Sequence, residues 1–143
     1  MDTKKRLIVL TVSFAIVAFG ALSWAADGGV KIPLMAAKPH PGASGTAIIN
    51  DQSISIQARG LKPDAVYTGW FVNMKPKKHV TGAGESPYMF KTDSYGSGAY
   101  SATLKGSPFG KWQMLMIMLH PTGDPTDMKN MVGALSAKLK KIK

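Results

Sequence analysis

The chain has 143 residues, no cysteine and a formal net charge of +10 at pH 7. Without cysteine it can form no disulfide, no thiolate metal site, no covalent haem attachment and no lipidated lipoprotein terminus. The excess of lysine and arginine indicates attraction to anionic partners through a long-range, salt-sensitive potential.

The first element in chain order has the pattern of a secretory signal peptide. A basic region at residues 4–6 precedes an apolar run over residues 7–22, which is shorter than the roughly 20 residues of an untilted membrane helix. Ser23 and Ala25 place small residues where a signal peptidase reads them. We expect cleavage after Ala25, no retained transmembrane helix, and export to a bacterial periplasm or to the cell exterior.

The remaining chain is long enough for one domain with a hydrophobic core. Residues 26–45 contain Pro33, Pro39 and Pro41, and predict an extended lead-in along the surface. Residues 46–143 are expected to form a β-rich domain with a basic tail.

Alternation of apolar and polar residues predicts the strands. Within residues 53–59, Ile54, Ile56 and Ala58 share one face and polar side chains share the other. Similar patterns predict further strands at residues 46–50, 66–73, 88–92 and 99–104. Two hairpins are expected, one from residues 46–59 and one from residues 88–104. Asp93 begins the turn of the second hairpin, where its carboxylate can accept from backbone amides two residues on.

A corner pattern precedes the strand expected at residues 66–73. Leu61 can fill the core, Pro63 can fix the turn, and the Tyr67 ring can return its hydroxyl to a backbone group across the corner. This spacing resembles the corner before a central strand in fibronectin type III and other immunoglobulin-like domains. The resemblance implies an antiparallel β-sandwich of about seven strands and implies no activity.

Two lysine clusters are the candidate binding residues. A glycine-rich loop over residues 74–87 is long enough to project from one end of the domain. The clusters are Lys75, Lys77 and Lys78 in this loop, and Lys138, Lys140, Lys141 and Lys143 at the C-terminus. They predict contact with an anionic envelope surface or a partner protein, or they serve solubility alone. Basic and aromatic residues do not alternate, so no specific nucleic acid is expected.

A buried strand is predicted over residues 112–120. Leu115, Ile117 and Leu119 share one face of it. The opposite face carries Trp112, Met114, Met116, Met118 and His120. This sulfur-rich face requires an explanation, because outward residues of a sandwich strand usually face water.

The structural explanation is a C-terminal amphipathic helix that covers the methionines, which are adaptable core fillers. Apolar residues recur at helical spacing after Thr126, namely Met128, Met131, Val132, Leu135, Leu139 and Ile142. Leu135, Ala137 and Leu139 also alternate, so a final strand is the alternative.

The functional alternative is copper, because thioethers and an imidazole suit Cu(I). The candidate ligands are Met114, Met116, Met118 and His120, with Met128 or Met131 as additions. Alternate residues of one strand stand about 6.6–7 Å apart, so such a site needs a ligand from a second element. An adaptable partner-binding patch is a third explanation.

Catalysis finds no support in the sequence. No nucleophile elbow, phosphate-binding glycine loop or zinc-protease helix motif occurs. Asp124 and Asp127 lie near His120 in sequence, but turn formation and capping account for both. The sequence therefore predicts an exported, non-catalytic binding or structural module of the bacterial envelope, with a periplasmic copper-binding protein as the alternative.

Overall fold

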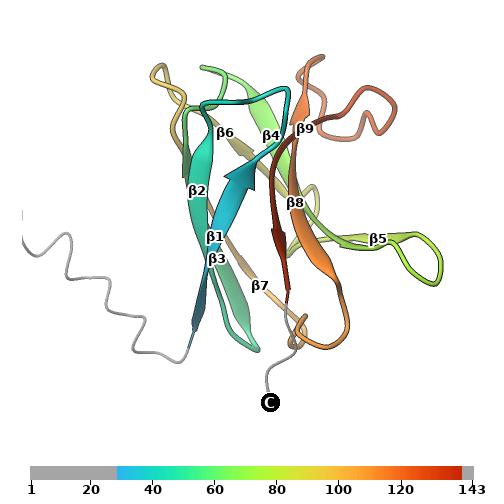
Figure 1. Cartoon of the computed structure of the whole chain (residues 1–143). Helices are drawn as coiled ribbons and strands as arrows, with labels where there is room; N and C mark the ends of the chain where they lie inside the picture. Colours follow the sequence, from blue (N-terminus) through green and yellow to red (C-terminus); the bar gives the residue numbers. More distant parts are fainter. Residues whose placement is uncertain (1–28, 140–143) are drawn as a thin grey trace, which may run out of the picture.

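A computed structural model describes residues 29–139, and these form antiparallel β-strands. The strands are β1 (Val30–Ala36), β2 (Ser44–Ile49), β3 (Ser53–Arg59), β4 (Val66–Asn73), β5 (His79–Gly82), β6 (Met89–Lys91), β7 (Gly98–Thr103), β8 (Met114–His120) and β9 (Val132–Lys138) (Figure 1). No helix occurs in this part of the chain, and so none that is long and apolar enough to cross a membrane. The predicted signal peptide and Lys140, Lys141 and Lys143 lie outside the described residues.

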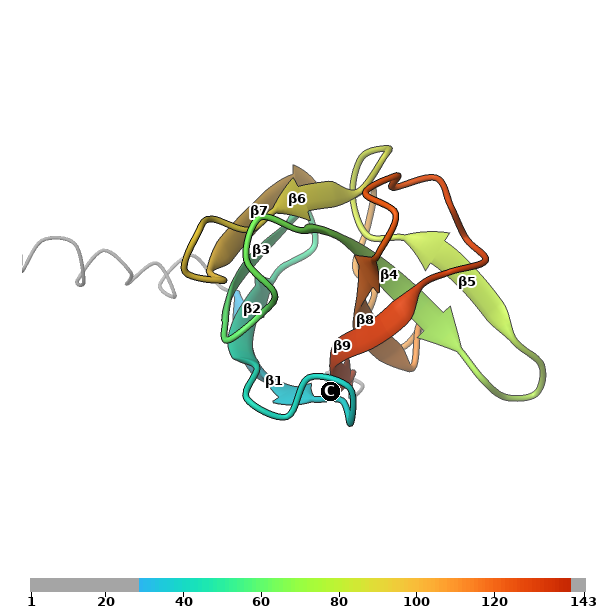
Figure 2. The ribbon, with the colours of Figure 1, turned by 90° about the horizontal axis from the view of Figure 1, so that it is seen from above.

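The strands follow one another in a single curled sheet rather than in two clearly separate layers. Their order is β5-β4-β8-β9-β1-β2-β3-β7, and β6 pairs with the first residues of β4 on the same edge as β5. Viewed along the strands, the sheet curves into a half-barrel that brings β6 near β7 (Figure 2). The rings of Phe90 and Tyr100 lie 6.2 Å apart at this approach. The expected antiparallel β fold class is therefore confirmed. The strands form one curled half-barrel, however, and not clearly the two layers of the expected sandwich.

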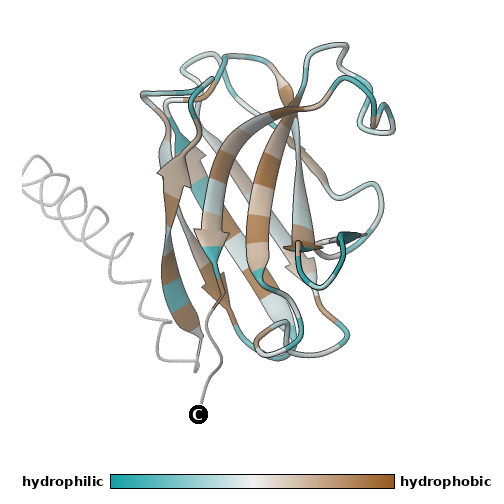
Figure 3. Ribbon diagram, turned by 45° about the vertical axis from the view of Figure 1, so that its right-hand side comes forward, coloured by the Kyte–Doolittle hydropathy of each residue, from teal (hydrophilic) through white to brown (hydrophobic). Residues whose placement is uncertain are grey.

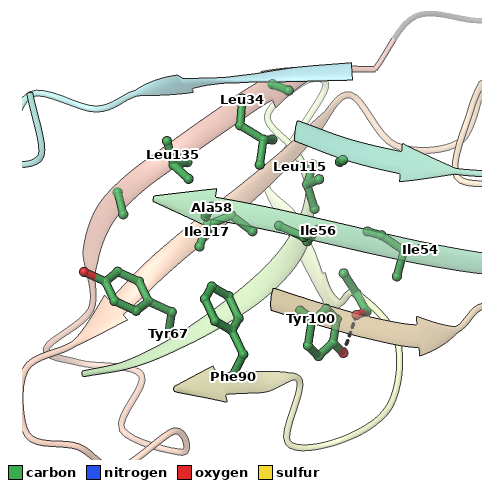
Figure 4. Close-up of a cluster of buried hydrophobic side chains, with 14 of the residues drawn as sticks. Leu34, Ile54, Ile56, Ala58, Tyr67, Phe90, Tyr100, Leu115, Ile117 and Leu135 are labelled. Carbon is green, nitrogen blue, oxygen red and sulfur yellow. Dashed lines mark hydrogen bonds between the residues drawn. The ribbon is translucent and has the colours of Figure 1, made fainter. Parts of the chain in front are cut away.

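Strand alternation builds the core inside the curl. Ile54, Ile56 and Ala58 are buried as their pattern predicts, and Leu115 and Ile117 of β8 face them from the other side (Figure 4). Leu119 of β8 belongs to the same buried cluster. Hydrophobic and hydrophilic bands alternate along the strands (Figure 3). At about 25 cal/mol per Å² of apolar surface, this burial is the main stabilising contribution of a cysteine-free domain.

The predicted corner is present. Leu61 and Tyr67 are buried, and the backbone N–H of Lys62 donates to the Tyr67 hydroxyl at 2.8 Å. Burial raises the pKa of Tyr67, while the Lys62 hydrogen bond opposes that rise. His40 Nε2 also lies 3.1 Å from the hydroxyl, so the loop after β1 is fastened to the same corner.

The expected lead-in contains a complete strand. β1 is extended, as predicted, but it pairs with β2 along five residues and with β9 at Met35 and Ala36. Pro33 is accommodated although it offers no N–H to the ladder. The predicted hairpin of residues 46–59 is confirmed as β2 and β3.

The second expected hairpin, over residues 88–104, is wrong, because its two strands do not pair with each other. β6 pairs with β4, whereas β7 pairs with β3, so the turn between them crosses from one side of the curl to the other. That turn is organised as predicted, because Asp93 Oδ1 accepts from the amides of Tyr95 and Ser97 at 2.8 and 2.9 Å.

The expected C-terminal helix is also wrong. Val132–Lys138 forms β9, which the alternation of Leu135, Ala137 and Leu139 indicated as the alternative. β9 pairs with β8 on one side and with β1 on the other, so its backbone is satisfied in the sheet. β9 therefore extends the sheet beside β8 and does not cover the methionine face of that strand.

Candidate functional site

Antiparallel strands divide the connecting loops between two ends of the molecule. The upper end, as drawn in Figure 1, holds the loops over residues 37–43, 60–65, 92–97 and 121–131. The lower end holds residues 50–52, 74–78 and 104–113, together with the start of β1 and the end of β9. Each end therefore gathers side chains from distant parts of the sequence.

Charge is unequally divided between the two ends. Within residues 29–139, the lower end carries one carboxylate, Asp51, and seven exposed lysines, which are Lys31, Lys75, Lys77, Lys78, Lys105, Lys111 and Lys138. The upper end is nearly balanced, with Lys38, Arg59, Lys62, Lys91 and Lys129 against Asp64, Asp93, Asp124 and Asp127. Glu85 lies between β5 and β6, next to Gly84, which lines a groove together with Lys105 and Lys111. We call the seven lysines and their surroundings the basic end.

The β4–β5 hairpin projects from the body as an arm (Figures 1 and 2). Every residue from 74 to 81 is exposed, including the three lysines of the first predicted cluster. Two apolar side chains flank these lysines, with Met74 53% and Val80 42% exposed. The arm thus presents positive charge and apolar surface together.

Gln113 joins this arm to the C-terminal strand. Its Oε1 accepts from the amides of Met74 and Lys75 at 2.7 and 3.2 Å, and its Nε2 donates to the Lys75 carbonyl at 3.0 Å. The Gln113 carbonyl accepts from the amide of Leu139 at 2.8 Å. The side chain of Gln113 therefore holds the first residues of the arm, while its backbone holds the residue that follows Lys138. Both lysine clusters begin beside Gln113, at the same end of the molecule.

Two grooves open at the basic end. One, of about 630 Å³, lies between β1 and β9 where these strands diverge, and Ile32, Phe109 and Met114 line it with Lys31 and Lys138. The other, of about 320 Å³, is lined by aromatic and basic side chains, including Tyr88, Trp112, Lys105 and Lys111. The two grooves thus adjoin four of the seven lysines, and the one between β1 and β9 is mainly apolar.

The sulfur-bearing face of β8 is half-buried. Met114, Met116 and Met118 are each partly accessible, whereas His120 at the end of the strand is only 2% exposed. In the ladder with β4, these four residues face Val72, Trp70, Thr68 and Val66 in turn. The methionines thus line the outside of the curl, opposite the core.

A hydrogen-bonded chain fixes His120. The Trp70 indole N–H donates to Thr68 Oγ1 at 2.7 Å, and Thr68 Oγ1 lies 2.6 Å from His120 Nε2. Thr68 is fully buried, so this chain is shielded from water. His120 Nδ1 is buried and has no hydrogen-bond partner within residues 29–139.

The carboxylates near His120 are occupied by their own loop. Asp124 accepts from the amide and hydroxyl of Thr126, which lower its pKa, and Asp127 accepts from Asn130 with the same consequence. Among the described residues, no three histidine, aspartate or glutamate side chains form a group that could hold a metal. Turn formation therefore accounts for these two aspartates.

Comparison of the chain with protein-family models, with curated proteins and with solved structures finds no match. Sequence reasoning identified both lysine clusters but missed Gln113, which joins them, because one glutamine in an apolar segment carries no motif. It also missed Lys31, Lys105 and Lys111, which adjoin the clusters only through the fold. For Thr68 and Trp70, the sequence indicated that both lie on one face of a strand, but not that they form a hydrogen-bonded chain with His120.

Proposed function

We propose that the protein is a non-catalytic module that attaches to an anionic phospholipid surface through its basic end. The observation that carries the proposal is the unequal division of charge, seven lysines against one carboxylate at the lower end. A field of one sign on one end orients the molecule toward a negative surface before contact. The predicted export is consistent with attachment inside a bacterial envelope.

Apolar surface within the basic end favours phospholipid over a hydrophilic polyanion. Met74 and Val80 flank the arm lysines and can enter the interfacial region while the ammonium groups remain at the headgroups. The groove between β1 and β9 adds apolar surface beside Lys31 and Lys138. The hydrophilic surface of a polysaccharide or of a nucleic-acid backbone gains less from these apolar groups than the interior of a lipid interface does.

The expected strength follows from the number of lysines. Each lysine near an anionic bilayer contributes about 1 kcal/mol, and the attraction decays within a Debye length of about 10 Å at 0.1 M salt. The exposed arm can bring Lys75, Lys77 and Lys78 within that distance together. Binding is therefore expected to weaken steeply as salt rises.

Co-sedimentation with phospholipid vesicles tests the proposal. The protein is expected to sediment with phosphatidylglycerol vesicles at low salt and to remain in solution with phosphatidylcholine. Replacing Lys75, Lys77 and Lys78 by glutamine removes about 3 kcal/mol, which corresponds to about 100-fold weaker binding. Met74→Ser with Val80→Thr should weaken phosphatidylglycerol binding further but leave binding to a soluble polyanion unchanged.

A matched triple variant provides the control. Lys38, Lys62 and Lys129 lie exposed at the upper end, and their replacement by glutamine changes the net charge by the same amount. This variant should bind phosphatidylglycerol vesicles nearly as well as the parent protein. Equal loss in both triple variants, or indifference of both to salt, would show that the basic end has no special role.

A further inference from the structure

His120 combines burial with an unused nitrogen. Its side chain is 2% exposed, Nε2 is 2.6 Å from Thr68 Oγ1, and Nδ1 is buried with no partner within residues 29–139. Burying an unpaired polar atom is unfavourable, so most native proteins pair it. The unpaired Nδ1 atom of His120 is therefore a candidate for binding a ligand.

In the tautomer of His120 that is protonated on Nε2, the hydrogen-bonded chain leaves Nδ1 free to bind a metal. The Thr68 hydroxyl has two lone pairs, so it can accept from the Trp70 indole and from a protonated Nε2 together. Nδ1 then carries a lone pair and no proton. Fixing the distal nitrogen through a hydrogen bond is how proteins orient metal-binding imidazoles.

Strand register supplies a thioether from a second element. Leu119 pairs with Val132, so Met131 occupies the next position, opposite His120. Val132 packs on the core with Leu119, and alternation therefore puts Met131 on the outer face with His120. Residues facing each other across an antiparallel pair have Cβ atoms about 4.5–5.5 Å apart.

Met118 completes the group on the same face. It pairs with Gly133, which carries no side chain, at a β-bulge between Ile117 and Met118. Met131 lies diagonally across from Met118, at a separation of about 7–8 Å that long side chains can bridge. The group thus comprises one imidazole from β8 and thioethers from β8 and from the residue before β9.

We propose that His120 Nδ1, Met118 Sδ and Met131 Sδ form a Cu(I) site on the outer face at the upper end. Thioether and imidazole donors are neutral and soft, which suits a monovalent copper ion, whereas Mg²⁺ and Ca²⁺ require oxygen donors. No carboxylate group within residues 29–139 offers a competing metal site.

The same spacing excludes the more distant methionines from this ion. Met114 is six residues from His120 along β8, which is about 20 Å at strand rise. Met116 faces Trp70 and Ser136, one step further from His120 than Met118. Met128 is 47% exposed in the loop before β9. The site lies away from the basic end, so it stands independently of lipid attachment.

Competition for Cu(I) tests the site. The purified protein is titrated anaerobically, with ascorbate present, into the coloured Cu(I)–bicinchoninate complex, and loss of absorbance reports transfer of one ion per chain. Met118→Leu and Met131→Leu preserve side-chain volume and fold, and each should weaken Cu(I) binding at least about tenfold. X-ray absorption should show two sulfur neighbours and one nitrogen neighbour.

Met128→Leu is the matched control, since it removes one thioether from the same loop outside the group. It should bind Cu(I) as the parent protein does. Thr68→Val should weaken binding while all three ligands remain, because Nε2 loses its partner. Failure of the parent protein to take Cu(I) from bicinchoninate, or equal affinity in all three methionine variants, would overturn the proposal.

Discussion

Tyr67 links three segments through one hydroxyl. The oxygen accepts from the Lys62 amide and lies 3.1 Å from His40 Nε2, while the ring stacks on Phe90 at 5.7 Å. The spacing from Leu61 predicted the bond across the corner, because those residues are close in sequence. The contact with His40 spans 27 residues, so no local pattern could indicate it.

Tyr67→Phe should destabilise the fold. The substitution keeps the ring but leaves the Lys62 amide without its acceptor, at a cost of about 1–2 kcal/mol in the free energy of unfolding. Urea denaturation followed by circular dichroism measures the change. Tyr95→Phe removes a hydroxyl from a side chain that is 87% exposed and should leave the midpoint unchanged. Equal midpoints for both variants would contradict a role for the corner.

Asp93 should couple stability to acid. Hydrogen bonds from the amides of Ser97 and Tyr95 lower its pKa below the ordinary value of 3.8. A lowered folded-state pKa means that stability is present above the unfolded-state value and is lost as pH falls through the folded one. Thermal unfolding should therefore lose stability below about pH 4. Asp93→Asn should flatten this loss, and an unchanged acid profile would contradict the assignment.

The sequence of β9 explains why a helix was predicted for the residues after Thr126. A bulge between Ile117 and Met118 shifts the register, so Ala134 and Leu135 are both buried although they are adjacent. The bulge disrupts the period of two, and the remaining apolar spacing fits a helix. Pairing on both sides of β9 decides the outcome, and one of the two partners, β1, lies about a hundred positions away in sequence. The sequence named Met118, His120 and Met131 among the candidate copper ligands, but only this register, which by extension puts Met131 opposite His120, selects these three.

At the scale of the element, the position of the β4–β5 arm depends on hydrogen bonds from Gln113. Gln113→Ala removes three hydrogen bonds to Met74 and Lys75, so amide hydrogen exchange at these two residues should accelerate about tenfold or more. Global stability should fall by only about 1 kcal/mol, because the bonds are exposed. Gln113→Glu retains the acceptor and should protect both amides better than alanine does. Identical exchange in the two variants would refute this role.

At the scale of the whole molecule, the approach of β6 to β7 gives the sheet its curl. The corner at residues 61–67 was readable from sequence, but it did not specify whether strands form two layers or one curved sheet. Phe90 packs closely over Gly98 where the two strands approach, since a Cβ at Gly98 would stand 2.6 Å from the Phe90 ring. The convergence of lysines at the lower end follows from the antiparallel order of the strands and from no single motif.

Gly98→Ala should open this approach and destabilise the protein. The added methyl group would force Phe90 away from Tyr100, at a cost of about 1–3 kcal/mol. Gly106→Ala is the control, because nothing lies within 4 Å of a Cβ there. Calorimetric melting temperatures distinguish the two, and an equal temperature for both variants would contradict a tight approach at Gly98.

The position of β1 between β2 and β9 governs when the fold can be completed. Met35 pairs with Ser136 and Ala36 pairs with Leu135, so the pairing of the first described strand is completed only when the last strand is present. A ribosome must release nearly the whole polypeptide before that junction exists, and contacts so remote in sequence close slowly. The β1–β9 junction is therefore expected to form last, and the sheet stays open at that seam until synthesis is nearly complete.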